Sequence, residues 1–268
     1  MSHAAAWRRA APAAAMLATL FVVATTLVPE ARADEQRVQR LGLALYVMPS
    51  GLALEDFNSE IDRLNAETAA FGQPFGSQAP IDEVKWDGIF GAELKYFINR
   101  NIAVIGGVGQ IKKESKLDLQ PVADGATLIR GYVRSVPIHL GADYYFEPRT
   151  SGDFTVRPFV GGGYVKVADT KTSVGYDLVR PDSTLTDFTD AYGNGHGFFL
   201  EAGAHMMFPS RYSILINANY RNAHVKQMND YETGAVIVDP QGELVETDIS
   251  GFGLRFAVQI SLWGKPPE

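Results

Sequence analysis

The sequence contains no cysteine, which excludes disulfides and thiolate chemistry. Histidine is scarce too, with 5 in 268 residues, and no HExxH pattern occurs. Because a metal site needs three or four ligands, we expect neither a metal centre nor a cofactor. Basic charge is not in excess either, since the formal net charge is −7. This balance argues against nucleic acid as a partner and against a basic membrane-surface patch.

The chain also lacks, after residue 33, any apolar run of the ~20 residues that a membrane helix needs. Before that point, Arg8 and Arg9 precede the apolar run "AAPAAAMLATLFVVATTLV" and the small-residue site "ARA". This order is typical of a secretory signal peptide over 1–33, with cleavage near Ala33. An uncut membrane anchor is the alternative. Residues 34–268 are then expected to form one domain.

Glycine is abundant, at 26 residues, and aromatic residues make up 11%, a combination that favours β structure with crowded interior positions. Turn signals separate eight strand-like segments. Each segment is at or above the ~9–11 residues that a tilted membrane strand needs. The segments are 40–48, 86–98, 102–117, 127–146, 154–168, 197–208, 212–226 and 247–263.

Apolar and polar residues alternate in most of these segments. In the last one, Phe252, Leu254 and Phe256 share a face, and Gly253 and Arg255 point the other way. Two segments, 102–111 and 154–168, are ambiguous because both of their faces are apolar or glycine. The connections alternate as well, between short turns such as "NRN" and "PSR" and mostly longer loops. Such asymmetry predicts an all-β, eight-stranded antiparallel transmembrane β-barrel with short periplasmic turns.

A soluble barrel would also alternate, but its polar face would be solvated. Over 198–208 the face holding Glu201 and His205 is completed by Phe199, Gly203 and Met207, which makes a poor solvated surface. It suits the narrow lumen of eight strands, where side chains fill the interior. Tyr144, Phe146, Phe208, Tyr212 and Tyr220 lie near strand ends, as the aromatic girdles of membrane barrels do.

One segment follows a different period. In "LEDFNSEIDRLNAETAAF", 54–71, Leu54, Phe57 and Ile61 recur at helical spacing. We therefore expect a short amphipathic helix inside the first extracellular loop, with a polar loop as the alternative.

Several segments together resemble the small outer-membrane β-barrel superfamily, which includes the membrane domain of outer membrane protein A and outer membrane protein W. The resemblance is carried by "VPIHLGADYYFEP", "RPFVGGGYVKV", "GFFLEAGAHMMFPSRYSILINANYR" and "GFGLRFAVQISLW" and covers roughly the last two thirds of the chain. It implies a barrel in the outer membrane of a Gram-negative bacterium. One departure is that "GKPPE" follows Trp263, where such barrels commonly end on an aromatic residue.

Charged residues on the polar faces are expected to meet in the lumen. Because an unpaired charge in a narrow, poorly hydrated lumen costs several kcal/mol, opposite charges should pair. The hypothesis is a network that plugs or gates the barrel, against the alternative that these side chains only fill space. The predicted set is Glu93, Lys95, His139, Asp143, Glu201, His205, Arg221 and Arg255. A metal held by Glu201 and His205 on a helix is disfavoured, because Gly203 and Pro209 would weaken that helix.

Catalysis is not expected. No histidine is followed two residues later by serine, as the barrel lipid A deacylases require, and no GxSxG or Walker-type loop occurs. The glycine runs "GGVG" and "GGG" lie inside predicted strands with no helix after them, so close packing explains them better than phosphate binding.

The sequence therefore predicts a non-enzymatic outer-membrane barrel with a structural or surface-interaction role and a narrow, polar, plugged lumen. Porin-like or outer membrane protein W-like passage of small or hydrophobic molecules is the alternative. The expected partners are outer-membrane lipid and lipopolysaccharide, the barrel assembly machinery, and an extracellular ligand bound through loops 49–85, 169–196 and 227–246.

Overall fold

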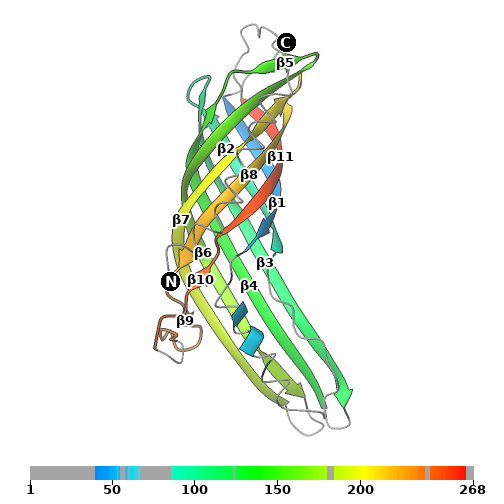
Figure 1. Cartoon of the computed structure of the whole chain (residues 1–268), viewed down its shortest axis with the longest axis vertical. Coiled ribbons are helices and arrows are strands. Elements are labelled where there is room, and N and C mark those ends of the chain that lie inside the picture. Colours follow the sequence, from blue (N-terminus) through cyan, green and yellow to red (C-terminus); the bar gives the residue numbers. More distant parts are fainter. Residues whose placement is uncertain are drawn as a thin grey trace.

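The computed structural model is a closed antiparallel barrel (Figure 1). It describes residues 40–52, 54, 58–59, 61–63, 66, 86–122, 125–179, 184–238 and 242–263. The predicted signal peptide and its cleavage site lie outside these ranges. Among the described residues, no helix is both long enough and apolar enough to cross a membrane.

Eight strands form the ring, as the sequence predicts. They are β1 (Leu41–Gly51), β2 (Trp86–Phe97), β3 (Ile102–Val122), β4 (Gly125–Tyr145), β6 (Phe154–Val179), β7 (Thr184–Met207), β8 (Tyr212–Val225) and β11 (Gly251–Trp263). Each strand pairs antiparallel with its neighbours, and β1 closes the ring by pairing with both β2 and β11. Three short strands are attached to it, β5 (Arg149–Ser151), β9 (Asn229–Asp230) and β10 (Thr247–Asp248). Over the part of the barrel where all eight strands are paired, closure leaves no free sheet edge.

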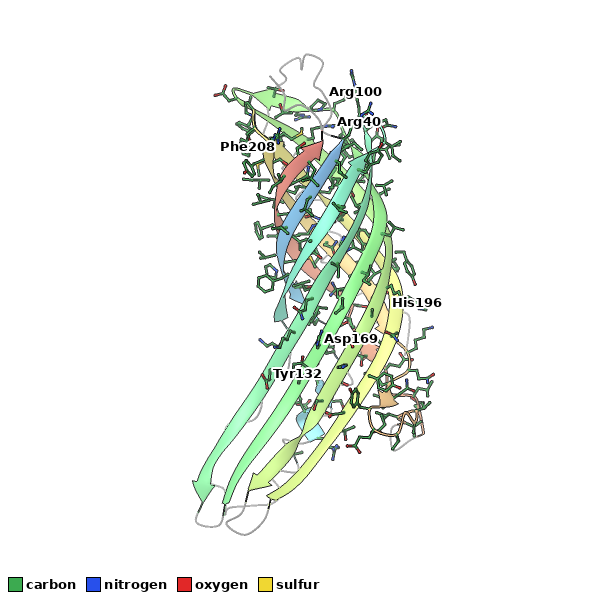
Figure 2. All side chains as sticks on the ribbon, turned by 180° about the vertical axis from the view of Figure 1, so that it is seen from behind. Arg40, Arg100, Tyr132, Asp169, His196 and Phe208 are labelled. Carbon is green, nitrogen blue, oxygen red and sulfur yellow. The ribbon has the colours of Figure 1, made fainter. Side chains whose placement is uncertain are left out.

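The two ends of the barrel differ. Connections 98–101, 146–153 and 208–211 lie at one end, which we call the turn end, and the opposite end is the loop end. Four neighbouring strands, β3, β4, β6 and β7, have 21 to 26 residues, whereas β1, β2, β8 and β11 have 11 to 14. The long strands extend well beyond the short ones at the loop end, which is the lower end in Figures 1 and 2.

This long wall corrects two predicted connections. The prediction of a loop over 169–196 is wrong, because β6 continues to Val179 and β7 begins at Thr184. The connection predicted over 118–126 is likewise mostly strand. The physical reason is that strands beyond the lipid need no apolar face, so their backbone ladder persists after the apolar alternation has stopped.

The apolar belt surrounds the ring on its outer face. Leu45, Phe90, Leu94 and Leu140 are exposed large apolar side chains, and Leu140 is 62% exposed. Tyr144 and Tyr212 are exposed near the turn end. On a water-facing surface such a belt would be a severe aggregation liability, whereas in a bilayer it is the lipid contact.

Part of the predicted first-loop helix is present. Residues 58–59, 61–63 and 66 are helical, and the N–H of Asn58 donates to the carbonyl of Leu54 at 2.9 Å. Leu54 and Ile61 are buried in the main hydrophobic cluster. Apart from Leu54, the other residues of the predicted helix, 54–71, lie outside the described part of the chain. Leu54 and Ile61 therefore pack against the interior of the barrel.

The apolar belt predicts that a charged side chain lowers the free energy of unfolding more near the bilayer midplane than outside the lipid. We expect Leu140→Arg to lower the free energy of unfolding by about 2–4 kcal/mol, because a cation then faces the bilayer midplane. Val238→Arg is the control, since Val238 is also exposed but lies in the connection between β9 and β10, and should change stability by less than about 0.5 kcal/mol. Urea unfolding of the vesicle-inserted protein measures both. Equal costs would contradict a membrane position for Leu140.

Candidate functional site in the barrel lumen

Alternation along the strands places the predicted polar residues inside the ring. Strand β2 supplies Glu93 and Lys95, β4 supplies His139 and Asp143, and β7 supplies Glu201 and His205. Arg221 comes from β8 and Arg255 from β11. All except His139 are buried, and the His139 side chain is only 12% exposed. The side chains therefore project into the lumen from five of the eight strands.

Arg255 is the centre of the first group of contacts. Its Nη1 donates to Glu93 Oε2 and its Nη2 to Glu201 Oε2, each at 2.7 Å. Its Nε donates to Asn217 Oδ1 at 2.9 Å, and Asn217 Nδ2 donates to Glu201 Oε2 at 2.5 Å. His139 Nε2 lies 2.9 Å from the same Glu93 oxygen. One guanidinium thereby joins carboxylates of two strands that are not neighbours in the ring, β2 and β7.

Lys95 is the centre of a second group, on the turn-end side of Glu93. Its Nζ donates to Asp143 Oδ2 and to the Tyr145 hydroxyl, both at 2.7 Å, and lies 3.8 Å from Glu93 Oε1. The same ammonium lies 4.9 Å from the ring centroid of Phe159, a cation–π distance. Because Lys95 reaches Glu93, the two groups form one continuous system, which we call the lumen network.

Two of the predicted residues lie beside the lumen network without joining its carboxylates. His205 Nε2 is 2.7 Å from Ser213 Oγ, and its other partner is an aromatic contact with Tyr145. Arg221 donates from Nε to the Ile249 carbonyl at 2.9 Å. The cation that contacts Glu201 is thus Arg255 and not Arg221.

Sequence reasoning missed Asn217 and Tyr145 as members of the lumen network. Both occupy inward positions of their strands, but neither carries a formal charge, so a search for charged side chains passes over them. The signal that was present is the alternation, since Asn217 shares the polar face of its segment with Arg221, and Tyr145 shares that of its segment with Asp143.

Glycines make room for the large polar side chains. A Cβ placed on Gly161 would lie 2.0 Å from Asp143 Oδ1, and one on Gly107 would lie 2.6 Å from the ring of His139. Real Cβ atoms do not approach so closely. Gly161 of the "GGG" run and Gly107 of the "GGVG" run therefore serve close packing in the lumen, as the position of both runs inside strands predicts.

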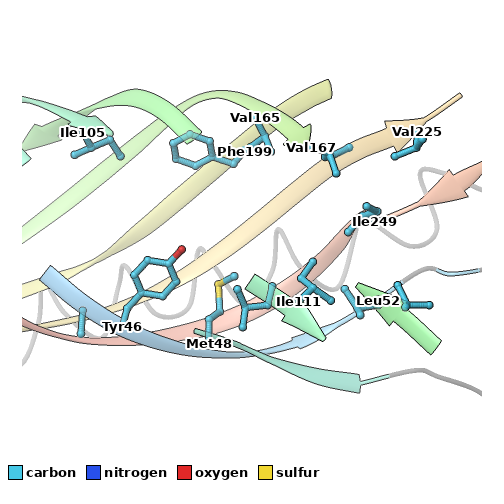
Figure 3. Close-up of a cluster of buried hydrophobic side chains, with 14 of the residues drawn as sticks. Tyr46, Met48, Leu52, Ile105, Ile111, Val165, Val167, Phe199, Val225 and Ile249 are labelled. Carbon is cyan, nitrogen blue, oxygen red and sulfur yellow. The ribbon is translucent and has the colours of Figure 1, made fainter. Parts of the chain in front are cut away.

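Toward the loop end the lumen becomes apolar, which differs from the expected polar interior. Met48, Ile111, Val165, Val167 and Phe199 point into this part of the ring (Figure 3). Leu54 and Ile61 from the first loop belong to the same cluster, which we call the apolar layer. The two segments whose faces were both apolar or glycine, 102–111 and 154–168, supply three of its residues, Ile111, Val165 and Val167.

Little space is left between the two levels. A cavity of about 30 Å³ lies where they meet, lined by Tyr46, His139 and Arg255 from the polar side and by Met48, Val165 and Phe199 from the apolar side. That volume holds about one or two water molecules. Among the described residues, no group of three or more His, Cys, Asp or Glu side chains gathers as a metal site would require.

Comparison with known proteins identifies the architecture. A model of the outer membrane protein beta-barrel domain matches residues 47–256. Solved structures with a similar fold include OprG from Pseudomonas aeruginosa, at 11% identity and a TM-score of 0.43, covering 84% of this chain and 96% of that one. AlkL in lipid bilayers is similar at 13% identity and a TM-score of 0.39, covering 87% and 93%.

Ail of Yersinia pestis, solved with the heparin analogue sucrose octasulfate, is also similar, at 12% identity and a TM-score of 0.35. That match covers 84% of this chain and 98% of Ail. No curated protein sequence matches the chain. At identities this low, the similar structures bear on the fold alone. The assignment of the chain to a family therefore rests on the family model that matches residues 47–256.

The lumen network predicts a large cost for losing its central cation. We expect Arg255→Met to lower the free energy of unfolding by about 3–5 kcal/mol, because Glu93 and Glu201 remain buried without a partner. Adding Glu93→Gln and Glu201→Gln should restore much of the loss, since the uncompensated charges are then gone. Urea unfolding of the folded barrel measures each variant.

Gln259→Met is the matched control. Gln259 faces the lumen from the same strand, four residues nearer the turn end, and its two amide atoms are buried without a hydrogen-bond partner in the described structure. This change should cost less than about 1 kcal/mol. A cost equal to that of Arg255→Met would mean that packing, not charge pairing, dominates the lumen.

Proposed function

Because the chain belongs to the outer membrane protein beta-barrel domain family, we propose that it is a non-enzymatic outer-membrane protein whose lumen is closed by the lumen network. Its role is then structural, or depends on surfaces outside the lipid, including the segments 49–85 and 227–246. Lipid of the outer membrane surrounds it, and the barrel assembly machinery inserts it. The observation that carries the proposal is Arg255 held between Glu93 and Glu201.

The charge arrangement supports closure. Three buried carboxylates, Glu93, Asp143 and Glu201, meet Lys95 and Arg255 at close range. An ion entering from water would have to replace its hydration shell with groups that are already engaged with one another. Space adds to this barrier, since the neighbouring cavity of about 30 Å³ admits only one or two water molecules.

Single-channel recording tests the closed lumen. The full-length folded protein in a planar bilayer should give no stepwise conductance. Arg255→Ala should create cation-selective steps, because truncation removes a large side chain and leaves two carboxylates unpaired in the lumen. Heat-dependent gel mobility checks that each variant is folded. A permanently conducting wild type would overturn the proposal, as would an Arg255→Ala barrel that is folded and silent.

A second function, passage of small apolar molecules, is favoured by the apolar layer. The layer continues the lumen from the lumen network to the loop end, and Leu54 and Ile61 of the first loop occupy it. The described pairing of β2 with β3 stops at Phe90 and Gln110, although β3 continues to Val122. A molecule that displaced the first loop would therefore find an exit between these strands toward the lipid.

Uptake of a small apolar dye by cells expressing the protein tests this route. If the apolar layer conducts such molecules, Ile111→Trp should reduce uptake severalfold, because Ile111 is fully buried in the layer. Val108→Trp is the control, since it lies on the same strand but faces outward. Equal uptake by both variants and by cells lacking the protein would reject passage and leave the closed lumen standing.

A further inference from the structure

The small cavity between the lumen network and the apolar layer is lined by groups that favour an anion. Apart from the imidazole of His139, its polar lining consists of side chains that can each donate a hydrogen bond, namely Tyr46, Asn219, Arg221 and Arg255. No carboxylate of the described residues lines it. Figure 3 shows Tyr46 and Phe199 on opposite sides of this part of the lumen.

Arg221 carries a buried donor that has no partner. Its side chain enters the lumen from β8, and the residue is only 4% exposed. Its Nε donates to the Ile249 carbonyl at 2.9 Å, but its Nη2 is buried without a hydrogen-bond partner in the described structure. An unsatisfied buried donor is costly, and more so when the group is charged. An acceptor inside the cavity would remove this cost.

Arg221 is also a buried cation without a carboxylate at contact distance. Histidines apart, the buried charged side chains of the described lumen are three carboxylates and four cations, namely Glu93, Asp143, Glu201, Lys95, Arg157, Arg221 and Arg255. Lys95 and Arg255 form ion pairs with all three carboxylates. Arg157 lies at the turn end, where it donates to the Arg100 carbonyl. Among the described residues, Arg221 is therefore the unpaired cation beside the apolar layer.

Other charges near β8 do not supply the missing acceptor. Asp248 pairs with the loop end of β8, but its Oδ1 lies 3.4 Å from His224 Nδ1 and accepts from the N–H of Ser250 at 2.8 Å. The lumen network has three carboxylates for two cations, so it offsets part of the Arg221 charge from a distance. A distant charge gives Nη2 no hydrogen bond, because that requires an acceptor at about 2.7–3.2 Å.

The size of the cavity restricts what can occupy it. Its volume of about 30 Å³ corresponds to one or two water molecules. A monatomic anion such as chloride fits this space, whereas a tetrahedral oxyanion has five heavy atoms and does not. Water fits as well, but it would leave the buried guanidinium without a counter-charge.

We propose that this cavity binds one monatomic anion, such as chloride. The ion accepts a hydrogen bond from Arg221 Nη2, and the amide of Asn219 is a further donor to it. In this position the anion neutralises Arg221 at the boundary where Val165 and Phe199 begin the apolar layer. The site goes beyond the closed lumen proposed above, because it assigns a ligand to the one level of the lumen where a donor is left over.

Crystallography with bromide tests the site directly. The full-length protein is refolded and crystallised in bromide in place of chloride, and data are collected at the bromine absorption edge. We expect one anomalous peak in the cavity, within hydrogen-bond distance of Arg221 Nη2. Arg221→Met should lose the peak, and Arg157→Met should keep it, because that variant removes a buried lumen cation at the other end of the barrel. A cavity that is empty or holds only water in the wild type would overturn the proposal, as would a peak that survives Arg221→Met.

The dependence of unfolding on chloride gives a second readout. Chloride is raised from about 10 mM to about 1 M at constant ionic strength, with gluconate as the replacing anion. The unfolding equilibrium constant of the wild type should fall at least severalfold, since only the folded barrel holds the ion. Arg157→Met should respond like the wild type, and Arg221→Met should not respond. Unfolding of the wild type that is independent of chloride would contradict the site.

This inference and the proposed function fail separately. Heat-dependent gel mobility first establishes that each variant is folded. A wild type that conducts in planar bilayers but shows the bromide peak would overturn only the closed lumen. A silent barrel whose cavity holds no anion would overturn only the anion site.

Discussion

The narrow lumen of an eight-stranded ring is the constraint on which the rest of this structure depends. Once β1 pairs with both β2 and β11, the inward charged side chains are buried in a narrow space, and their favourable partners are one another. Arg255 pairs with two carboxylates, those of Glu93 and Glu201, and Lys95 pairs with that of Asp143. Inward glycines such as Gly161 then follow from the space that these polar side chains require. Charge pairing and strand composition are consequences of one geometric limit, and so is the closed lumen that we propose.

Much of the ring could be predicted from the sequence because the lipid imposes a strict alternation. Leu140 and Asp143 fall on opposite faces in the structure, as they do in the sequence pattern. The alternation also indicates which residues face the lumen, but not which of them meet. The pattern does not distinguish Arg221 from Arg255. Only the strand register determines that Arg255 donates to Glu201 and that Arg221 donates to the Ile249 carbonyl.

The errors of prediction lie where the lipid stops. Beyond the belt the backbone of β6 and β7 keeps its ladder as far as Val179 and Thr184, but nothing there selects apolar residues on alternate positions. The amino-acid composition of these strand ends therefore resembles that of a loop, although their backbones are hydrogen-bonded as strands. The apolar layer was missed for a different reason, because apolar residues and glycines on both faces of 102–111 and 154–168 hide which face points inward.

The four long strands are consecutive in the ring, and so are the four short ones. The rim at the loop end is therefore oblique, high along β3, β4, β6 and β7 and low along β8, β11, β1 and β2. A cylinder with a level rim presents the same profile to every neighbour in the membrane plane. This barrel is tall along its four long strands and low along its four short ones. A molecule that approaches in the membrane plane therefore meets a different surface on each side. The rotation of the barrel about its own axis determines which of these surfaces a neighbour contacts.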